Sequence, residues 1–319
     1  MTRFINMRAV AAAGPMKAAH YPFPRSAALQ DALSWCMTDY YMKAAAGGDF
    51  EARGVLVTGQ TRVGKTHEIK RLVRRINDAH DVMPNGQPAK FVHCILSGKV
   101  TWKDLGVKTL EALGYPAEGR RTQTYIWDMV VDQARRQGVI GIHYDECQHV
   151  FTDDGAKTNR IFLDSFKTLL KDSRWPLILI LSGVPELARH IDKEKQLSHL
   201  LRPVSFELID PDRDLHELNH LAFSYADQAG LDFEPLSNAD FFQRLSHACA
   251  NRWGLVIELV IEAFKICSLA GQTQVTLDHF AEAFSEAYGT PRGFSPFTVS
   301  DYRESFDPDR LLEILAREG

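Results

Sequence analysis

Residues Gly59 to Thr66 read Gly-Gln-Thr-Arg-Val-Gly-Lys-Thr, which matches the P-loop pattern G-x-x-x-x-G-K-[ST]. A short apolar run, Val55 to Val57, precedes the pattern and predicts a buried strand. Apolar residues at helical spacing follow it, namely Ile69, Leu72, Val73 and Ile76. A loop between a strand and a helix is the setting in which this pattern holds nucleotide phosphates, so we expect a nucleotide site here.

The residue types in this loop suit that chemistry. Gly59 and Gly64 allow a tight backbone turn that exposes N–H groups to phosphate oxygens. Lys65 brings a positive charge to the β and γ phosphates, and Thr66 offers a hydroxyl to Mg²⁺. The helix that starts here adds the positive end of its dipole. The predicted cofactors are ATP and Mg²⁺, and the predicted binding residues are Gly59, Gln60, Thr61, Arg62, Val63, Gly64, Lys65, Thr66 and His67.

A second apolar run ends in adjacent carboxylates, since residues 139–146 read Val-Ile-Gly-Ile-His-Tyr-Asp-Glu. In P-loop ATPases this arrangement is the Walker B motif. Asp145 is then expected to join Thr66 in binding Mg²⁺, and Glu146 is expected to orient and polarise the attacking water. The alternative is that both carboxylates only cap a loop.

Two further polar residues follow apolar segments and complete the predicted catalytic set. Ser182 ends the apolar strand predicted over 177–181, where it would sense the γ phosphate; a simple turn at the strand end explains it equally well. Arg202 stands between a predicted helix over 186–201 and a predicted strand over 203–208. From there it would reach the phosphates of a neighbouring subunit, with Arg189 as the second choice for that role.

The order of elements predicts an α/β core with a parallel sheet flanked by helices, followed by a small helical lid. We expect an extension over 1–50, the nucleotide-binding core over 51–209, the lid over 210–290 and a tail over 291–319. The extension contains Tyr21 to Pro24, which would dock on a neighbouring surface or serve as a linker. The tail carries four aromatic residues that would bind a partner or pack on their own domain: Phe294, Phe297, Tyr302 and Phe306.

Composition sets limits on the class of protein. The 319 residues carry a net charge of -4, so no overall basic charge points to nucleic acid, although local basic clusters can still bind it. The five scattered cysteines lie mostly in apolar runs and indicate buried thiols in a reducing compartment. We find no signal-peptide pattern and no apolar stretch long enough for a membrane span. We therefore expect a cytoplasmic protein without membrane partners.

The whole pattern resembles the AAA+ family, in which an α/β P-loop core precedes a helical lid. More narrowly, it is similar to transposition ATPases of the TniB/TnsC type and to their IstB- and MuB-like relatives. The resemblance covers about residues 20–290 and rests on three stretches: His-Tyr-Asp-Glu-Cys-Gln-His at 143–149, Ser-Gly-Val-Pro-Glu-Leu at 182–187, and Gln-Leu-Ser at 196–198.

The resemblance implies an ATPase that assembles on double-stranded DNA as a ring or helical filament and recruits a transposase, sometimes with a target-selector protein. It implies catalytic roles for Lys65, Asp145, Glu146 and Ser182. The chain departs from the family in two places. His199 to Leu201 stand where relatives often have arginines, and Gly254 is followed by Glu258 where a sensing arginine is common, with Arg252 the nearest cation. We therefore expect slow hydrolysis.

DNA contacts are expected from a local basic surface with the residues Lys99, Thr101, Lys103, Arg120 and Arg121. Contacts of this type are made to phosphates, so binding would be largely independent of sequence. A solvated basic face is the alternative. For the whole protein, the first hypothesis is a regulator of transposition, and thus of DNA recombination. The rivals are a AAA+ switch outside transposition, of an initiator-like or defence-associated kind, and a nucleotide-bound scaffold with little turnover.

Overall fold

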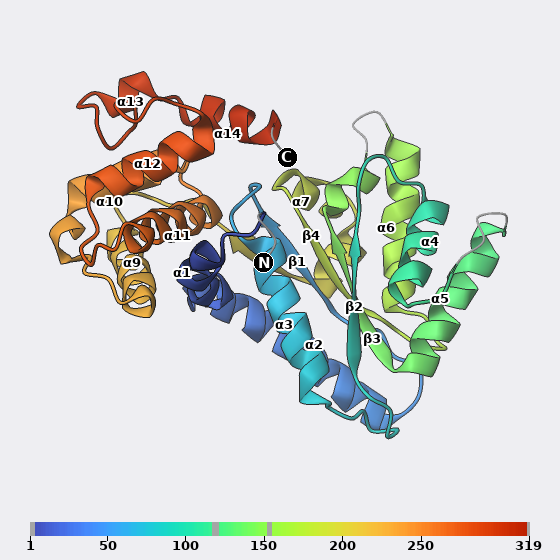
Figure 1. The fold of residues 1–319 in the computed structure, drawn as a ribbon. Coiled ribbons are helices and arrows are strands. Elements are labelled where there is room, and N and C mark those ends of the chain that lie inside the picture. Colours follow the sequence, from blue (N-terminus) through green and yellow to red (C-terminus); the bar gives the residue numbers. More distant parts are fainter. Residues whose placement is uncertain (1–3, 117–120, 152–154, 318–319) are drawn as a thin grey trace. The chain divides into compact units, whose positions relative to one another are not determined.

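The computed structural model describes residues 4–116, 121–151 and 155–317. By its contacts the chain divides into two compact units, which we treat separately. The core unit comprises Phe23–Glu207, and the helical unit comprises Met1–Pro22 together with Leu208–Gly319. The predicted fold class is confirmed, because the core unit is a parallel sheet flanked by helices and the C-terminal region is helical (Figure 1).

Within the described residues, the core unit contains one parallel sheet with the strand order β2-β3-β4-β1-β5. Its strands are β1 (Gly54–Gly59), β2 (Lys90–Ile95), β3 (Val139–Asp145), β4 (Ile178–Gly183) and β5 (Leu201–Phe206). Strands β3 and β4 are buried along their whole length, which explains their apolar sequences. Because all strands are parallel, their carboxyl ends meet at one edge of the sheet, and this edge carries Asp145, Ser182 and the P-loop that follows β1.

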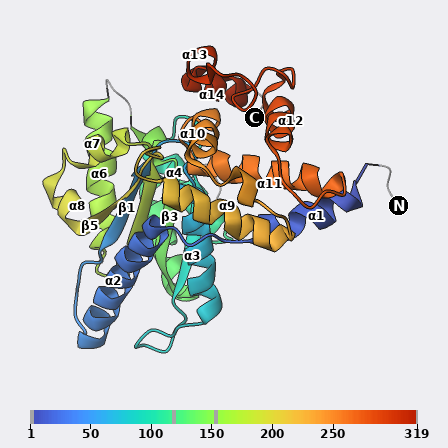
Figure 2. The same cartoon turned by 90° about the vertical axis from the view of Figure 1, so that its left-hand side faces the viewer.

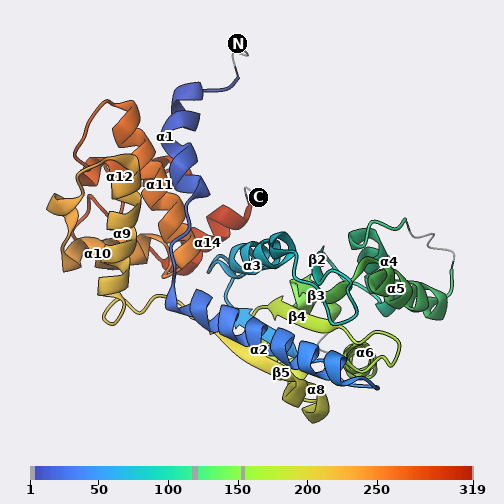
Figure 3. The ribbon, with the colours of Figure 1, turned by 90° about the horizontal axis from the view of Figure 1, so that it is seen from below.

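Helices cover both faces of this sheet (Figure 3). They are α2 (Pro24–Ala46), α3 (Lys65–Ala79), α4 (Trp102–Ala112), α5 (Gln123–Gln137), α6 (Ala156–Leu170), α7 (Glu186–Ile191) and α8 (Lys195–Leu200), with the 3₁₀ turn η1 (Cys147–Val150). Helix α2 packs against β1 and β5, so residues 23–50 belong by contact to the core unit rather than forming a separate extension. Whether residues 1–50 act as a separate part stays a prediction.

Two element boundaries differ from the sequence prediction. The single helix predicted over 186–201 is wrong, because α7 ends at Ile191 and α8 begins at Lys195. The hydroxyl of Ser198 donates to the carboxylate of Asp192 at 2.9 Å, a local bond that competes with continued helix. Strand β5 begins at Leu201, not at Pro203. Pro203 is tolerated within it because β5 is an edge strand and needs no ladder partner on its outer side.

The helical unit contains α1 (Met7–Ala18), α9 (Leu215–Ala229), η2 (Glu234–Leu236), α10 (Ala239–Ala248), α11 (Trp253–Leu269), α12 (Leu277–Tyr288), α13 (Tyr302–Ser305) and α14 (Pro308–Arg317). Helix α1 has no counterpart in the sequence prediction, and it contains Gly14 and Pro15, two residues that disfavour helix. It lies against α9 and α11 and buries Ala13 and Met16 (Figure 2). Tertiary packing thus holds a segment that contains a helix breaker.

The aromatic residues of the segment 291–319 pack mainly on their own unit. Phe297, Tyr302 and Phe306 are buried, while Phe294 is 45% exposed. Their rings contact side chains of α10 and α12, among them Phe241, Phe280, Phe284 and His247. This packing is the alternative left open above, and binding of a partner by this segment stays a proposal.

The remaining global features concern membrane spans and thiols. Among the described residues, the structure contains no helix with the length and apolar character that a membrane crossing requires. All cysteines of the chain lie in the described part, where they are free and buried: Cys36, Cys94, Cys147, Cys249 and Cys267. Burial raises the pKa of each of these thiols above its usual value. They therefore act as small apolar core residues.

Candidate nucleotide site at the P-loop

The P-loop joins β1 to α3 in a backbone conformation that depends on its glycines. A β-carbon at Gly59 would lie 2.4 Å from the carbonyl oxygen of Phe206 in the neighbouring strand β5. Gly64, with φ of 101°, adopts a conformation that residues with a β-carbon rarely reach. Arg62 also has a positive φ, of 61°, although it is not glycine. This tight turn brings the chain from the strand to the first residue of α3.

Lys65 lies within this loop. Its ammonium group donates hydrogen bonds to the carbonyl oxygens of Gly59 at 2.7 Å and Gln60 at 2.8 Å. The side chain is 5% exposed, so the charge is held inside the turn and not in bulk solvent. Of the other predicted loop residues, Val63 is buried, whereas Thr61, Arg62 and His67 are exposed. The structure thus gathers the predicted nucleotide-binding residues around one positive charge.

The centre of the site is the carboxylate of Asp145 at the end of β3. The Thr66 hydroxyl donates to its Oδ2 at 2.8 Å, and the Ser182 hydroxyl donates to its Oδ1 at 2.6 Å. The backbone N–H of Glu146 also donates to Oδ1, at 3.1 Å. Burial acts to raise the pKa of the Asp145 carboxyl, but the hydrogen bonds from the hydroxyls of Ser182 and Thr66 act to lower it. The pKa lies below its usual value, so the group is ionised at neutral pH.

The residues present fit a bound Mg²⁺ ion. The hydroxyl oxygen of Thr66 and the Oδ2 atom of Asp145 are 2.8 Å apart, and oxygen atoms are the ligands that this ion prefers. No group of three or more His, Cys, Asp and Glu side chains able to hold a metal occurs among the residues with a described position. Mg²⁺ in nucleotide sites needs only one or two protein ligands, because phosphates and waters supply the rest.

Glu146 follows Asp145 with a φ of 55°, in the left-handed region. Its carboxylate accepts a hydrogen bond from the side-chain amide of Gln148. The amide oxygen of Gln148 in turn accepts from the backbone N–H of Val184 at 3.3 Å. A β-carbon at Gly183 would lie 2.4 Å from that amide oxygen, so glycine is needed for the approach. Gln148 therefore ties Glu146 to the end of β4.

Sequence reasoning missed several residues of this site. The guanidinium of Arg25 lies close to the P-loop, since a β-carbon built at Gly64 would be 4.0 Å from it. The same guanidinium lies 4.0 Å from the ring centre of Phe23 and 5.5 Å from the ring centre of Phe206. No motif marks Phe23 and Arg25, because their proximity to the loop arises only from the packing of α2. His143 did carry a signal, since it is a polar residue inside a buried strand, two positions before Asp145.

Arg202 does not lie at its own chain's P-loop. In the sheet register it faces Val55, four residues before Gly59 in β1, so it lies towards the amino ends of the strands. It is exposed on the edge strand, and its guanidinium lies 5.6 Å from the ring of the half-exposed Trp35. A role of Arg202 at the phosphates of a neighbouring subunit stays a prediction.

Of the predicted DNA-contact residues, Lys99, Thr101 and Lys103 lie between the end of β2 and the first turn of α4, and Arg121 lies just before α5. Lys99 and Arg121 are exposed, and Lys103 is half-buried. The hydroxyl of Thr101 is bonded to Asp104 at 2.6 Å and caps α4, so it is engaged within the chain. The guanidinium of Arg121 lies 5.2 Å from the ring of Tyr125. Arg120 lies outside the described residues.

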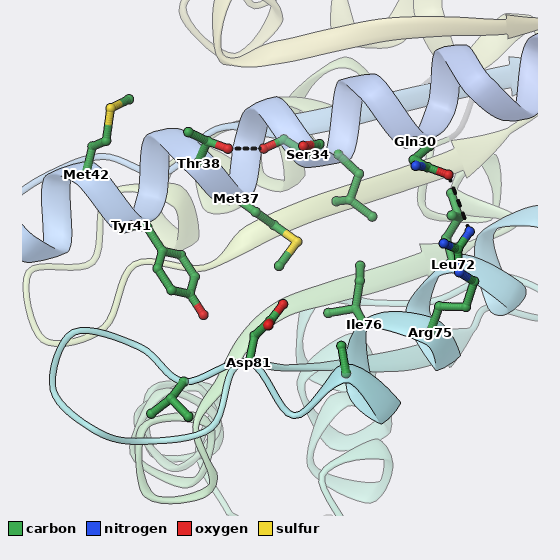
Figure 4. Close-up of a pocket in the computed structure, with 13 residues that line it drawn as sticks. Gln30, Ser34, Met37, Thr38, Tyr41, Met42, Leu72, Arg75, Ile76 and Asp81 are labelled. Atoms are coloured by element: carbon green, nitrogen blue, oxygen red, sulfur yellow. Dashed lines mark hydrogen bonds between the residues drawn. The ribbon is translucent and has the colours of Figure 1, made fainter.

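A separate groove of about 620 Å³ lies between α2 and α3 (Figure 4). Met37, Tyr41 and Ile76 line it, together with Arg75 and Asp81 at its polar margin. It contains none of the P-loop or Walker B residues. We therefore place the chemistry at the P-loop, where the hydrogen-bonded carboxylate and the buried ammonium group lie, and not in this groove.

Comparison with known proteins supports the fold. Residues 49–191 match a family model described as AAA domain. Compared by sequence with curated proteins, the chain shows no significant match. Similar solved structures include ORC2 of Aeropyrum pernix in ADPNP–ADP complexes, with 15% identity and a TM-score of 0.56, covering 85% of this chain and 71% of that chain. Cdc6p of Pyrobaculum aerophilum has 12% identity and a TM-score of 0.59, with 86% and 70% covered.

ORC1 of Aeropyrum pernix, solved in complex with DNA, has 14% identity and a TM-score of 0.57, with 86% of this chain and 69% of that chain covered. At such identities the likeness concerns the fold. The AAA+ part of the resemblance is confirmed, whereas none of these findings singles out the transposition ATPases. Residues 49–191 match the AAA domain model, and the fold of the chain is similar to that of the ORC and Cdc6 proteins.

We predict that Lys65→Ala loses most of its affinity for ATP, because the change removes the charge placed to meet the phosphates. Titration with a fluorescent ATP analogue in the presence of Mg²⁺ measures the affinity. Lys90→Ala is the matched control, since Lys90 is exposed at the start of β2 and should bind like wild type. Equal affinity in Lys65→Ala and wild type would reject the assignment of the P-loop as the nucleotide site.

Proposed function

We propose that this protein is an ATPase that hydrolyses ATP with Mg²⁺ and assembles on double-stranded DNA as a homo-oligomer. The observation that carries the proposal is the set of hydrogen bonds that joins Thr66, Asp145 and Ser182 next to Lys65. These residues come from the start of α3 and from the ends of β3 and β4, and they converge where the Walker motifs predict the magnesium end of a nucleotide. If Asp145 only capped a loop, Thr66 and Ser182 would not both need to donate hydrogen bonds to its carboxylate.

Each residue then has a role in hydrolysis. Lys65 and the P-loop N–H groups hold the phosphates, and Thr66 and Asp145 hold the metal ion. A bound Mg²⁺ ion would neutralise charge that develops on the phosphate oxygens. Glu146, held by Gln148, orients and polarises the attacking water. The hydroxyl of Ser182 donates to Asp145, so it lies beside the predicted metal ligand, where it could act as the sensor of the γ phosphate.

Assembly would complete the site from a neighbouring copy. Arg202 is exposed on the edge strand β5, away from its own P-loop, and its guanidinium lies over Trp35. A trans-acting arginine needs this combination of exposure and orientation. Arg252 in the helical unit is 9% exposed and donates to the carbonyl oxygen of Ala250 at 3.1 Å, which leaves it engaged within its own unit. Because Arg252 is engaged in this way, we propose that hydrolysis is slow. We also propose that the oligomer is cytoplasmic.

DNA would be held through phosphates by Lys99 and Lys103 near the start of α4 and by Arg121 just before α5. Arg120 and Thr101 belong to the same predicted set. A regulator of transposition, which recruits a transposase and a target selector, is supported by the residues at 143–149 and 182–187 that resemble TniB and TnsC proteins.

An initiator-like AAA+ switch is the second candidate, and it is favoured by the likeness of the fold to the DNA-bound ORC1 protein. The two candidates differ in their protein partners. Capture of a purified transposase by the protein on DNA, in the presence of an ATP analogue, would favour the first. Stable ATP-dependent assemblies that form without DNA and ignore a transposase would favour the second.

We predict that Glu146→Gln binds ATP with wild-type affinity but hydrolyses it at least about 100-fold more slowly, because an amide cannot polarise water as a carboxylate does. Phosphate release under saturating ATP measures the turnover. Glu186→Gln is the control, since Glu186 is exposed at the start of α7 and lies outside the hydrogen-bonded set. Turnover close to wild type in Glu146→Gln would mean that another group activates the water.

We predict that Arg202→Ala loses hydrolysis but keeps ATP binding, since a trans-acting arginine is typically worth about 10³ or more in rate. Mixing Arg202→Ala with Lys65→Ala subunits should restore part of the activity, because some interfaces then combine an intact P-loop with an intact Arg202. Size measurements must show that the mixed oligomers form. Intact mixed oligomers without any recovery would exclude Arg202, and Arg189 would then be tested.

We predict that duplex binding requires an ATP analogue and weakens steeply as salt rises, because phosphate contacts release counterions. A variant with Lys99, Lys103, Arg120 and Arg121 changed to alanine should bind more weakly and show a shallower salt dependence. A control with Arg74, Lys90, Arg135 and Arg136 changed to alanine removes the same charge from exposed sites elsewhere. If the two variants behave alike, the DNA contacts lie elsewhere; if wild type binds no duplex, the DNA part of the proposal fails.

A further inference from the structure

A line of hydrogen-bonded side chains crosses the sheet behind the magnesium end of the site. His93 in β2 and His143 in β3 face each other in the strand register, and their Nδ1 atoms are 2.7 Å apart. The Nε2 atom of His143 lies 2.7 Å from the hydroxyl of Ser182 in β4. That hydroxyl bonds to Asp145 at 2.6 Å. The line therefore runs from the edge strand to the predicted metal ligand.

The positions of the protons in this line follow from the chemistry of its members. The Asp145 carboxylate is ionised and can only accept hydrogen bonds, so at 2.6 Å the hydroxyl proton of Ser182 must point towards it. Ser182 then has no proton to give to His143 and must accept one from Nε2–H. His143 is fully buried, and its two ring nitrogens each lie 2.7 Å from a hydrogen-bonding partner, the imidazole of His93 and the hydroxyl of Ser182, an arrangement that fits a neutral ring. A neutral imidazole ring that carries its proton on Nε2 has no proton on Nδ1, so Nδ1 can only accept a hydrogen bond.

His93 must then supply the proton between the two rings. With a bare acceptor on His143, the short Nδ1–Nδ1 contact requires His93 to carry its proton on Nδ1. The other ring nitrogen of His93, Nε2, is buried and has no hydrogen-bond partner among the described residues, which agrees with a bare lone pair there. The reverse direction would leave the Ser182 oxygen and the Asp145 carboxylate in contact without a proton, which is strongly unfavourable.

We propose that His143, held in one tautomer by His93, is a positioning residue that directs the hydroxyl proton of Ser182 onto Asp145 and away from any other acceptor in the sheet. Because His143 can only donate to Ser182, the hydroxyl proton is left with Asp145 at 2.6 Å as its near acceptor, while the carbonyl oxygen of Tyr144 lies at 3.5 Å. A phosphate oxygen of the nucleotide is the other destination that we propose. The Ser182 hydroxyl can therefore donate either to Asp145 or to the nucleotide. His93, in the edge strand β2, favours donation to Asp145 because it fixes the tautomer of His143. The functional part of this proposal rests on the ATPase function proposed above.

The proton positions can be tested directly in the nucleotide-free protein. Two-dimensional ¹H–¹⁵N spectra of ring nitrogens distinguish protonated from bare positions in each histidine, and the chain has 12 histidines to resolve. Spectra of His93→Gln and His143→Gln assign the two signals. We expect the Nε2–H form for His143 and the Nδ1–H form for His93. The opposite tautomers, or a protonated ring at neutral pH, would overturn the proposal whether or not the protein hydrolyses ATP.

Kinetics test the consequence for the site. In His143→Gln the amide nitrogen can take the place of Nε2–H, whereas His143→Leu removes the donor. We expect kcat to fall by about tenfold in His143→Leu with little change in KM, and to recover in His143→Gln. His93→Leu should lower kcat in the wild-type background but not in His143→Gln, since the amide of glutamine needs no partner to fix its proton.

Controls separate this role from simple loss of packing. His80→Gln changes an exposed histidine at the end of α3 and should leave kcat and stability unchanged. Thermal unfolding and ATP-analogue affinity are measured for every variant. Equal loss in His143→Gln and His143→Leu, or loss that follows stability alone, would reject the positioning role. If wild type shows no turnover at all, the ATPase proposal fails, while the tautomer spectra still decide the proton positions.

Discussion

The Asp145 carboxylate is the constraint on which the site depends. It is almost completely buried, and an ionised carboxylate in such a place is unfavourable unless donors surround it. Here Thr66, Ser182 and the N–H of Glu146 supply those donors from different parts of the core unit. The end of β3, the start of α3 and the end of β4 must therefore keep their mutual positions, and the P-loop is fixed to the sheet through the same bonds.

The parallel sheet makes this arrangement possible. Its central strands are buried on both faces, so their sequences are almost wholly apolar, and polar residues gather where the strands end. His143 is the exception within β3, and it is accommodated because His93 and Ser182 satisfy both of its ring nitrogens. A buried network of this kind is stable only when its members are paired, which couples the edge strand β2 to the site.

Much of the fold followed from local patterns. The apolar runs, the P-loop and the helix-ending glycines predicted the strands and most helices of the described chain, because these signals depend on residues close in sequence. The prediction failed where packing or a local bond overrode the pattern. Helix α1 persists through Pro15 because it packs on α9 and α11, and Asp192 with Ser198 divides the segment 186–200 into two helices.

The sequence by itself determined the chemistry of the site: Lys65, Thr66, Asp145 and Glu146 are recognisable because each motif is contiguous and its residue types have few other uses. Only the tertiary structure decided what surrounds them. The contact between His93 and His143, the bond from Gln148 to Glu146 and the approach of Arg25 to Gly64 join segments whose proximity depends on strand order and on the packing of α2. Such contacts leave no local pattern in the chain, because the sheet order β2-β3-β4-β1-β5 is set by the burial of whole elements.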